Sequence, residues 1–211
     1  MAEVCRASSR VGIRIKTGHG GKKIEISIIC SKVGIKIKYD DLAEYTGENY
    51  NIFNVLGVYH DELSHSAVIG DLLNAKGKHG QKDTFLRLFL KELPSFENNS
   101  SQFKVIETFK TANSRVFIEK HIGKVNYENG EGGRIDILIN DGKNNIIIEN
   151  KVWAGDQYLQ LVRYNNQDKN APILYLTVEG KEPKTSSRDN LKLGETFICI
   201  SYKDTIKKWL E

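Results

Sequence analysis

The stretch Arg134-Ile-Asp-Ile-Leu-Ile-Asn-Asp-Gly-Lys-Asn-Asn-Ile-Ile-Ile-Glu-Asn-Lys151 predicts a β-hairpin, and the interpretation of the chain starts from it. Residues 134–139 and 146–151 are rich in isoleucine and alternate in the middle, as strands do. The residues between them are turn formers. A two-residue turn at Gly142-Lys143 fits, because a type II′ turn prefers glycine at its first central position.

This turn places Asp136 directly opposite Glu149, with Lys151 on the same face. Two like charges facing each other destabilise a sheet, and their Cβ atoms would lie roughly 5 Å apart. A divalent cation with oxygen ligands would relieve the repulsion, and Mg²⁺ suits a site that also recruits phosphate oxygens. The opposite face is the expected core, made by Ile135, Ile137, Ile146 and Ile148.

The alternative is a solvated strand face that carries mixed charge. Each residue taken singly favours that alternative. The register, the isoleucine backing and the polar helix expected downstream together favour a cation site.

Asp136 and the run Glu149-Asn150-Lys151 form a D…E-x-K pattern that resembles the PD-(D/E)XK nuclease superfamily. Gln160 and Tyr164 resemble the Q-x-x-x-Y element of its recombination-exonuclease branch. Residues 148–157 and 61–66 resemble a group of bacterial and phage members. The likeness covers roughly residues 51–210.

The resemblance implies an α/β (α+β) restriction-endonuclease-like core, in which a central mixed sheet is flanked by helices. It also implies a Mg²⁺-dependent deoxyribonuclease that leaves a 5′-phosphate, with Mn²⁺ able to substitute. Asp136, Glu149 and the backbone carbonyl of Asn150 would hold the metal, and Lys151 would position or activate water. The expected location is the cytoplasm, for a bacterial or phage-encoded protein.

Glu62 is the candidate for a further acidic metal ligand, because family members bring a glutamate from an N-terminal helix to this site. A solvated acid on a helix surface is an equally good interpretation. Asp61 lies beside it, and the family pattern favours Glu62. His65, one turn later, is expected to be packed or hydrogen-bonded rather than catalytic.

Gln160 and Tyr164 are four residues apart and therefore share one helix face. The resemblance places them beside the active site, where they would contact phosphate or orient Lys151. Alternatively, Tyr164 packs in the core and Gln160 is merely exposed. Arg134 and Arg163 are candidate phosphate contacts, since guanidinium groups match phosphate oxygens, although surface charge explains both equally well.

Composition indicates one globular domain with an appendage. The 211 residues are 39% hydrophobic and 27% charged, which is ordinary for a chain that can bury a core. We expect no membrane span and no secretory signal. The three cysteines are odd in number and show no zinc or disulfide pattern, so reduced thiols are expected.

The N-terminal segment is strongly basic. Residues 1–38 hold nine lysines and arginines against two acids, although the whole chain has a net charge of only +4. The motif at 11–16 returns at 33–38, which predicts two or three short strands with cations along one face. We therefore divide the chain into a basic β appendage, 1–45, and a nuclease domain, 46–211. The candidate DNA contacts here are Arg14, Lys16, Lys36 and Lys38, and the alternative is a solvated face that guards an edge strand.

With the two hairpin strands included, the core elements follow in the order α-β-β-β-α-β. Helices are expected near 60–73, at 83–93, at 157–167 with Asp156 as N-cap, and at 203–210. Strands are expected at 116–123, 173–178 and 197–201.

Two other functions stay open from sequence: a nucleic-acid-binding module with an inactive nuclease-like core, and a hydrolase of another phosphoester. Exonuclease or endonuclease action and the oligomeric state, including a homodimer, also stay open.

Overall fold

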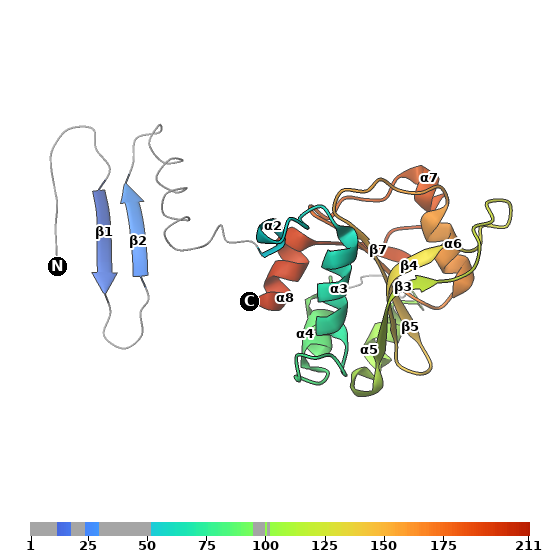
Figure 1. Ribbon diagram of the computed structural model, residues 1–211, viewed down its shortest axis with the longest axis horizontal. Coiled ribbons are helices and arrows are strands. Elements are labelled where there is room, and N and C mark those ends of the chain that lie inside the picture. Colours follow the sequence, from blue (N-terminus) through green and yellow to red (C-terminus); the bar gives the residue numbers. More distant parts are fainter. Residues whose placement is uncertain (1–11, 18–23, 30–51, 95–99, 101) are drawn as a thin grey trace. The chain divides into compact units, whose positions relative to one another are not determined.

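A five-stranded mixed sheet organises the C-terminal unit of the computed structural model (Figure 1). The structure describes residues 12–17, 24–29, 52–94, 100 and 102–211. The chain divides into two compact units, 1–57 and 58–211, and each is described by itself. The strand order is β3-β4-β5-β6-β7, with β3 Arg115–His121, β4 Arg134–Asn140, β5 Asn145–Lys151, β6 Ile173–Thr177 and β7 Phe197–Ser201.

The first three strands pair antiparallel, and β5, β6 and β7 pair parallel. Parallel neighbours need a long crossover, which α6 (Gln160–Gln167) supplies between β5 and β6, and α7 (Thr185–Arg188) lies between β6 and β7. The expected fold class, a mixed sheet flanked by helices, is confirmed.

The hairpin has the predicted register. Ile137 pairs with Ile148 across β4 and β5, and the Asp141 N–H donates to the Asn144 carbonyl at 3.1 Å. Gly142 has φ +97°, a conformation that side chains rarely adopt, so the turn needs glycine at this position.

Ile135 corrects one detail of the prediction. The other three isoleucines of the expected core face lie in one buried cluster, whereas Ile135 lies in a second cluster with Leu161 and Tyr164. The strict alternation breaks at Asp136, because the β4–β5 pairing runs only from Ile137 to Asn140 on β4. On the other side of β4, Glu119 interrupts the pairing of β3 with a φ of +54°.

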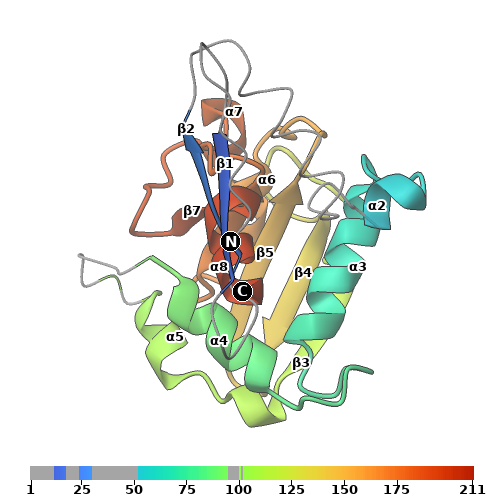
Figure 2. The same ribbon diagram turned by 90° about the vertical axis from the view of Figure 1, so that its left-hand side faces the viewer.

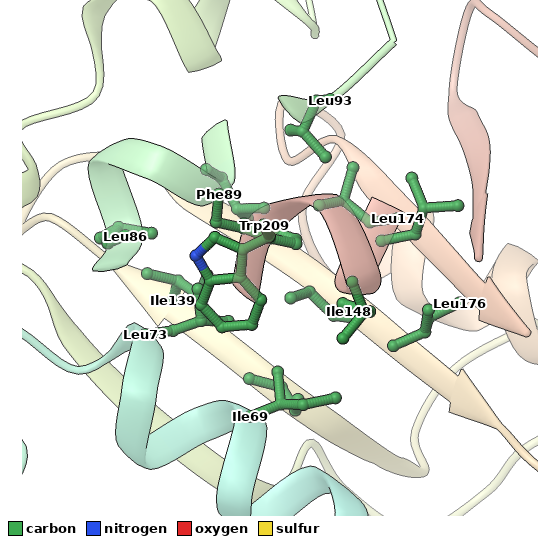
Figure 3. Packing of buried hydrophobic residues seen from close by; sticks show 14 of the residues in the cluster. Ile69, Leu73, Leu86, Phe89, Leu93, Ile139, Ile148, Leu174, Leu176 and Trp209 are labelled. Atoms are coloured by element: carbon green, nitrogen blue, oxygen red, sulfur yellow. The ribbon is translucent and has the colours of Figure 1, made fainter. Parts of the chain in front are cut away.

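The first and larger core cluster packs between the sheet and three helices, which Figure 2 shows together on one face of the sheet. Figure 3 shows side chains of this cluster at close range. These helices are α3 (Glu62–Leu73), α4 (Thr84–Glu92) and α8 (Lys207–Leu210). Trp209 packs edge-on against Phe89, with ring centroids 5.1 Å apart, and its indole N–H donates to the Phe85 carbonyl at 2.8 Å. The short helix α5 (Lys104–Thr108) adds partly buried side chains to the same cluster.

The second cluster lies on the opposite face, under α6. Leu161 and Tyr164 of this helix pack with Ile147, Ile173 and Phe197 of three strands, and all five are buried. The sheet is therefore covered on both faces, which is why β5, β6 and β7 are almost continuously buried.

Helix α6 starts later than predicted. Leu159, with φ +51°, occupies the N-cap position, and Asp156 is not the cap. The Asp156 carboxylate instead accepts hydrogen bonds from the Tyr175 hydroxyl at 2.5 Å and the Lys184 N–H at 2.9 Å. The predicted helix at 83–93 is confirmed as α4, and the predicted last helix begins with a π-helical turn, Tyr202–Ile206.

The N-terminal unit contains β1 (Gly12–Thr17) paired antiparallel with β2 (Ile24–Ile29), followed by α2 (Ile52–Val55). This confirms two of the short strands predicted there. The second copy of the repeat, with Lys36 and Lys38, lies outside the described residues. The boundary between residues 45 and 46 stays a prediction, and the units separate at 57/58. In the described part of the chain, no helix has the length and apolar character needed to cross a membrane.

Phe89→Ala should destabilise the C-terminal unit by about 3–5 kcal/mol, because it removes a fully buried ring and leaves a cavity beside Trp209. Leu88→Ala, on the exposed side of the same helix, is the matched control and should cost less than about 1 kcal/mol. Urea unfolding followed by circular dichroism measures both, and equal losses would contradict this packing.

Candidate active site

Glu149 is an ionisable group with no exposure to solvent. Its Oε1 lies 2.6 Å from the ammonium of Lys151 and accepts a hydrogen bond of 2.6 Å from the Gln160 amide. Its Oε2 lies 2.8 Å from the Tyr164 hydroxyl. A buried carboxylate is costly unless it is paired and hydrogen-bonded, and three side chains meet that need here.

Asp136 approaches the same place from the neighbouring strand. Its Oδ2 accepts a hydrogen bond of 2.8 Å from the Asn150 N–H, the residue that follows Glu149. The backbone of Asn150 thus donates to a side chain of β4, at the point where the β4–β5 pairing has ended. The predicted juxtaposition of Asp136, Glu149 and Lys151 is present in the structure.

Burial raises the pKa values of both carboxyl groups. Burial raises the pKa of Asp136 to about 6, against the stabilising effects of the Asn150 N–H and Lys151. Burial, and then repulsion from Asp136, raises the pKa of Glu149 to about 8. Although burial alone would lower it, the pKa of Lys151 is raised by Glu149 and Asp136, so Lys151 stays an ammonium. One cation thus faces two acids.

Gln160 and Tyr164 hold Glu149 rather than Lys151. The Gln160 amide bridges Glu149 Oε1 and the Tyr164 oxygen, at 2.6 and 3.1 Å. The Tyr164 hydroxyl shares its proton between Glu149 Oε2 and the Arg134 carbonyl, the latter at 2.6 Å. Tyr164 is fully buried, so it fixes the carboxylate and does not reach a phosphate.

Glu62 projects from the first turn of α3 into the loop that follows β5. A single oxygen, Oε1, accepts hydrogen bonds from three consecutive backbone N–H groups, Val152, Trp153 and Ala154, at 2.7–2.8 Å. Glu62 therefore ties this loop to α3, and only its second oxygen is left for a metal. Asp61 has a different task, since it caps the helix through the Leu63 N–H.

Asn150 is buried, and its side chain points to the α3 face. The amide donates to Ser66 Oγ at 3.0 Å, and the amide oxygen accepts from the Tyr202 hydroxyl at 3.0 Å. These bonds fix the peptide on either side of Asn150, which carries the predicted carbonyl ligand. His65 is packed as predicted, with Nε2 2.9 Å from the Tyr59 carbonyl.

Arg163 does not lie where a phosphate could reach it. Its side chain is buried, and the guanidinium donates to the Gly132 carbonyl and to Gln157 Oε1, both at 2.9 Å. A side chain on Gly133 would meet this guanidinium at 2.3 Å. Arg163 therefore braces the loop between β3 and β4, and we do not retain it as a DNA contact.

Arg134 remains exposed and forms an ion pair with Glu119, with Nε 2.5 Å from Oε2. Sequence analysis did not single out Glu119. The pairing of β3 with β4 places Glu119 beside Asp136, and this pairing could have pointed to Glu119. Repulsion from Glu119 contributes to the raised pKa of Asp136.

These side chains line one groove of about 950 Å³. Its floor and walls include Glu62, Glu119, Asp136, Lys151, Arg134 and Gln160. Glu149 lies behind this lining, and its ion-pair partner Lys151 faces the groove. The groove also receives backbone from the β3–β4 loop and from the loop after β5, at Gly123 and Gly155.

The donor set fits Mg²⁺. Among the described residues, no three acidic, histidine or cysteine side chains converge to hold a metal by themselves. Mg²⁺ does not require such a cage, since it binds through one or two carboxylates and keeps several waters or substrate phosphates. Asp136 Oδ1 and the remaining lone pair of Glu149 Oε2 are the acceptors that the protein's own hydrogen bonds leave.

One comparison with known proteins identifies the family. A model of the PD-(D/E)XK nuclease superfamily matches residues 50–211, which contain the whole sheet and every residue of the groove. No curated protein and no solved structure matches the chain. With the match spanning most of its length and the D…E-x-K residues brought together by β4 and β5, the chain belongs to the PD-(D/E)XK nuclease superfamily.

Proposed function

We propose that this protein is a Mg²⁺-dependent deoxyribonuclease whose active site is the groove at Asp136, Glu149 and Lys151. The observation that carries the proposal is the Lys151–Glu149 ion pair of 2.6 Å, set beside the Asp136 carboxylate. A pair of close acids with a raised pKa is a costly arrangement for a structural role, whereas binding a cation between them recovers that cost.

Each residue has a distinct part in this proposal. Asp136 and Glu149 would hold the metal together with the backbone carbonyl of Asn150, and Tyr164 and Gln160 would fix the Glu149 carboxylate. The bound metal would polarise the phosphodiester and lower the pKa of a water molecule.

Lys151 would orient the attacking water and offset the negative charge that develops on the phosphate oxygens. Its ammonium is almost buried, with 9% side-chain exposure, yet it lines the groove, so a substrate can reach it. Arg134, exposed at the rim, would contact a neighbouring phosphate. In β1, Arg14 and Lys16 remain proposed contacts to the phosphate backbone of DNA.

Lys151→Ala and Asp136→Asn should each reduce cleavage of DNA in Mg²⁺ by at least about 100-fold, because each removes charge from the reaction centre. Lys143→Ala is the matched control, since Lys143 is an exposed lysine in the turn of the same hairpin. Gel assays on plasmid, linear duplex, single-stranded DNA and RNA measure this. Either variant cutting at the wild-type rate would refute the assignment.

Mg²⁺ should stabilise the protein more as pH rises. The folded-state pKa values of Asp136 and Glu149 are raised to about 6 and about 8, so without metal the folded protein holds protons that the unfolded chain releases. Their contribution to stability is therefore full at low pH and is lost as pH rises through 6 and 8. Mg²⁺ competes with these protons.

The measurement is the difference in melting temperature between Mg²⁺ and EDTA, taken below pH 6 and above pH 8. A saturating metal would add about 3 kcal/mol at 100 times its Kd, a rise of several degrees. Asp136→Asn should abolish the difference. An equal Mg²⁺ effect at both pH values would contradict metal binding by these carboxyl groups.

Glu62→Gln should separate the two tasks of Glu62. Glutamine keeps one oxygen for the three backbone N–H groups of residues 152–154 but removes the charge, so the melting temperature should stay near wild type while the Mg²⁺ concentration for half-maximal cleavage rises about tenfold. Glu62→Ala should both lower the melting temperature and raise the Mg²⁺ concentration for half-maximal cleavage. Wild-type Mg²⁺ dependence of Glu62→Gln would limit Glu62 to anchoring the loop.

A further inference from the structure

Two groups of exposed aromatic rings border the groove. The Trp153 cluster contains Tyr59, His60 and Trp153, with the His60 ring 4.5 Å from Trp153 and 5.0 Å from Tyr59. The Tyr127 pair contains Tyr127 and Tyr158, with ring centroids 5.7 Å apart. Exposed fractions are 61% for Trp153, 56% for Tyr158, 54% for Tyr127 and 40% for Tyr59.

Both groups adjoin residues that line the groove. His60 itself lines it, and Trp153 lies between the lining residues Lys151 and Ala154. In the other group, Tyr158 follows the lining residue Gln157, and Tyr127 lies two residues beyond Val125. The rings are thus within one or two residues of the reaction centre's own walls.

The two groups adjoin helices on opposite faces of the sheet. Tyr59 and His60 lie just before Asp61, the N-cap of α3, and α3 packs on the face of the sheet that holds the larger core cluster. Tyr158 lies just before Leu159, the N-cap of α6, and α6 covers the other face. The strand ends that carry Asp136 and Lys151 lie between these layers, so a strand crossing the groove would meet rings before and after the scissile phosphate.

The rings are held in place rather than merely left at the surface. The Trp153 N–H donates to Glu62 Oε1 at 2.8 Å, which fixes its backbone to α3. The Arg163 guanidinium lies 6.0 Å from the Tyr127 ring and is itself fixed by two hydrogen bonds. In the described residues, five Trp, Tyr or Phe side chains are exposed, and Phe117 is the one outside these two groups.

The groove holds few cations to grip a substrate by its phosphates alone. The lining has four acids against three lysines and arginines: Asp61, Glu62, Glu119 and Asp136, with Lys124, Arg134 and Lys151. Cations neutralise phosphates in complexes of both duplex and single-stranded DNA, so charge alone does not separate the two forms. The exposed rings do, since a ring stacks on a base only when that base has left its pair and its stack.

We infer that the substrate is single-stranded DNA, with unpaired bases stacked on the Trp153 cluster on one side of the scissile phosphate and on the Tyr127 pair on the other. This inference rests on the proposed nuclease function and adds the form of the substrate. A free single strand, a flap and a frayed duplex end share the required chemistry.

Binding tests the inference apart from cleavage. The full chain carrying Asp136→Asn, in EDTA, is titrated into a fluorescently labelled single strand, its blunt duplex and the RNA of the same sequence, each about 12 nucleotides long. Anisotropy should show the single-stranded DNA bound at least about tenfold more tightly than the duplex, with quenching of tryptophan fluorescence. Equal or tighter binding of the duplex, or tighter binding of the RNA, overturns the inference.

Variants then locate the stacking. Trp153→Leu and Tyr127→Leu should each weaken single-strand binding about 5- to 100-fold, whereas Trp153→Phe should retain most of it, because phenylalanine keeps a ring and leucine keeps only apolar bulk. Phe117→Leu removes an exposed ring of β3 that belongs to neither group, and it should leave single-strand binding unchanged. Melting temperatures confirm that each variant is folded, and wild-type binding by both leucine variants overturns the inference.

The outcomes separate the two proposals. Ring-dependent binding of single strands without Mg²⁺-dependent cleavage of any substrate would remove the nuclease function and leave the binding surface. Mg²⁺-dependent cleavage that is equal on duplex and single strand, and insensitive to Trp153→Leu, would keep the nuclease and remove the inference.

Discussion

The buried carboxylate of Glu149 is the constraint on which the proposed active site depends. A charge removed from water has to be compensated locally, and the compensating groups here come from two elements, β5 itself and α6. Lys151 comes from the same strand, Gln160 and Tyr164 come from α6, and Tyr164 is in turn oriented by the Arg134 carbonyl at the start of β4. Strands β4 and β5 and helix α6 are thus bound together at the point where chemistry is proposed.

Burial also gives the two acids different environments. Asp136 lines the groove and has one carboxylate oxygen fixed by a backbone N–H, whereas Glu149 lies behind the lining with both oxygens engaged. Both pKa values are raised, first by the loss of solvent and then by repulsion from nearby carboxyl groups. A cation entering from the groove would meet Asp136 first, and Glu149 would complete its surroundings from below.

The hairpin could be predicted from sequence because two local signals agree. The period of two sets the faces, and Gly142 fixes the turn, so the opposition of Asp136 and Glu149 follows by counting. Counting residues put Ile135 on the wrong face, because β3, which lies outside the hairpin, distorts the pairing at Glu119. The alternation within one hairpin does not reveal the effect of a third strand.

The burial of Arg163 and the partners of Asp156 escaped prediction for a related reason. Arginine on a polar helix favours exposure, and only the close approach of the Gly132–Gly133 backbone makes a buried guanidinium possible. Asp156 beside a helix start favours an N-cap, yet the Tyr175 hydroxyl and the Lys184 N–H, both distant in sequence, compete for its oxygens. Partners supplied by tertiary structure override a local preference that is worth only about 1 kcal/mol.

Glu62 links the chemistry to the rim of the groove. By accepting three successive N–H groups from the loop after β5, it holds that loop in one conformation and makes α3 part of the reaction centre's wall. The middle N–H of the three belongs to Trp153, so the same bonds that anchor the loop also set an exposed indole two residues from Lys151. The position of the ring is therefore a consequence of the way the groove is built, since the backbone that carries it is held by the same carboxylate oxygen as its neighbours.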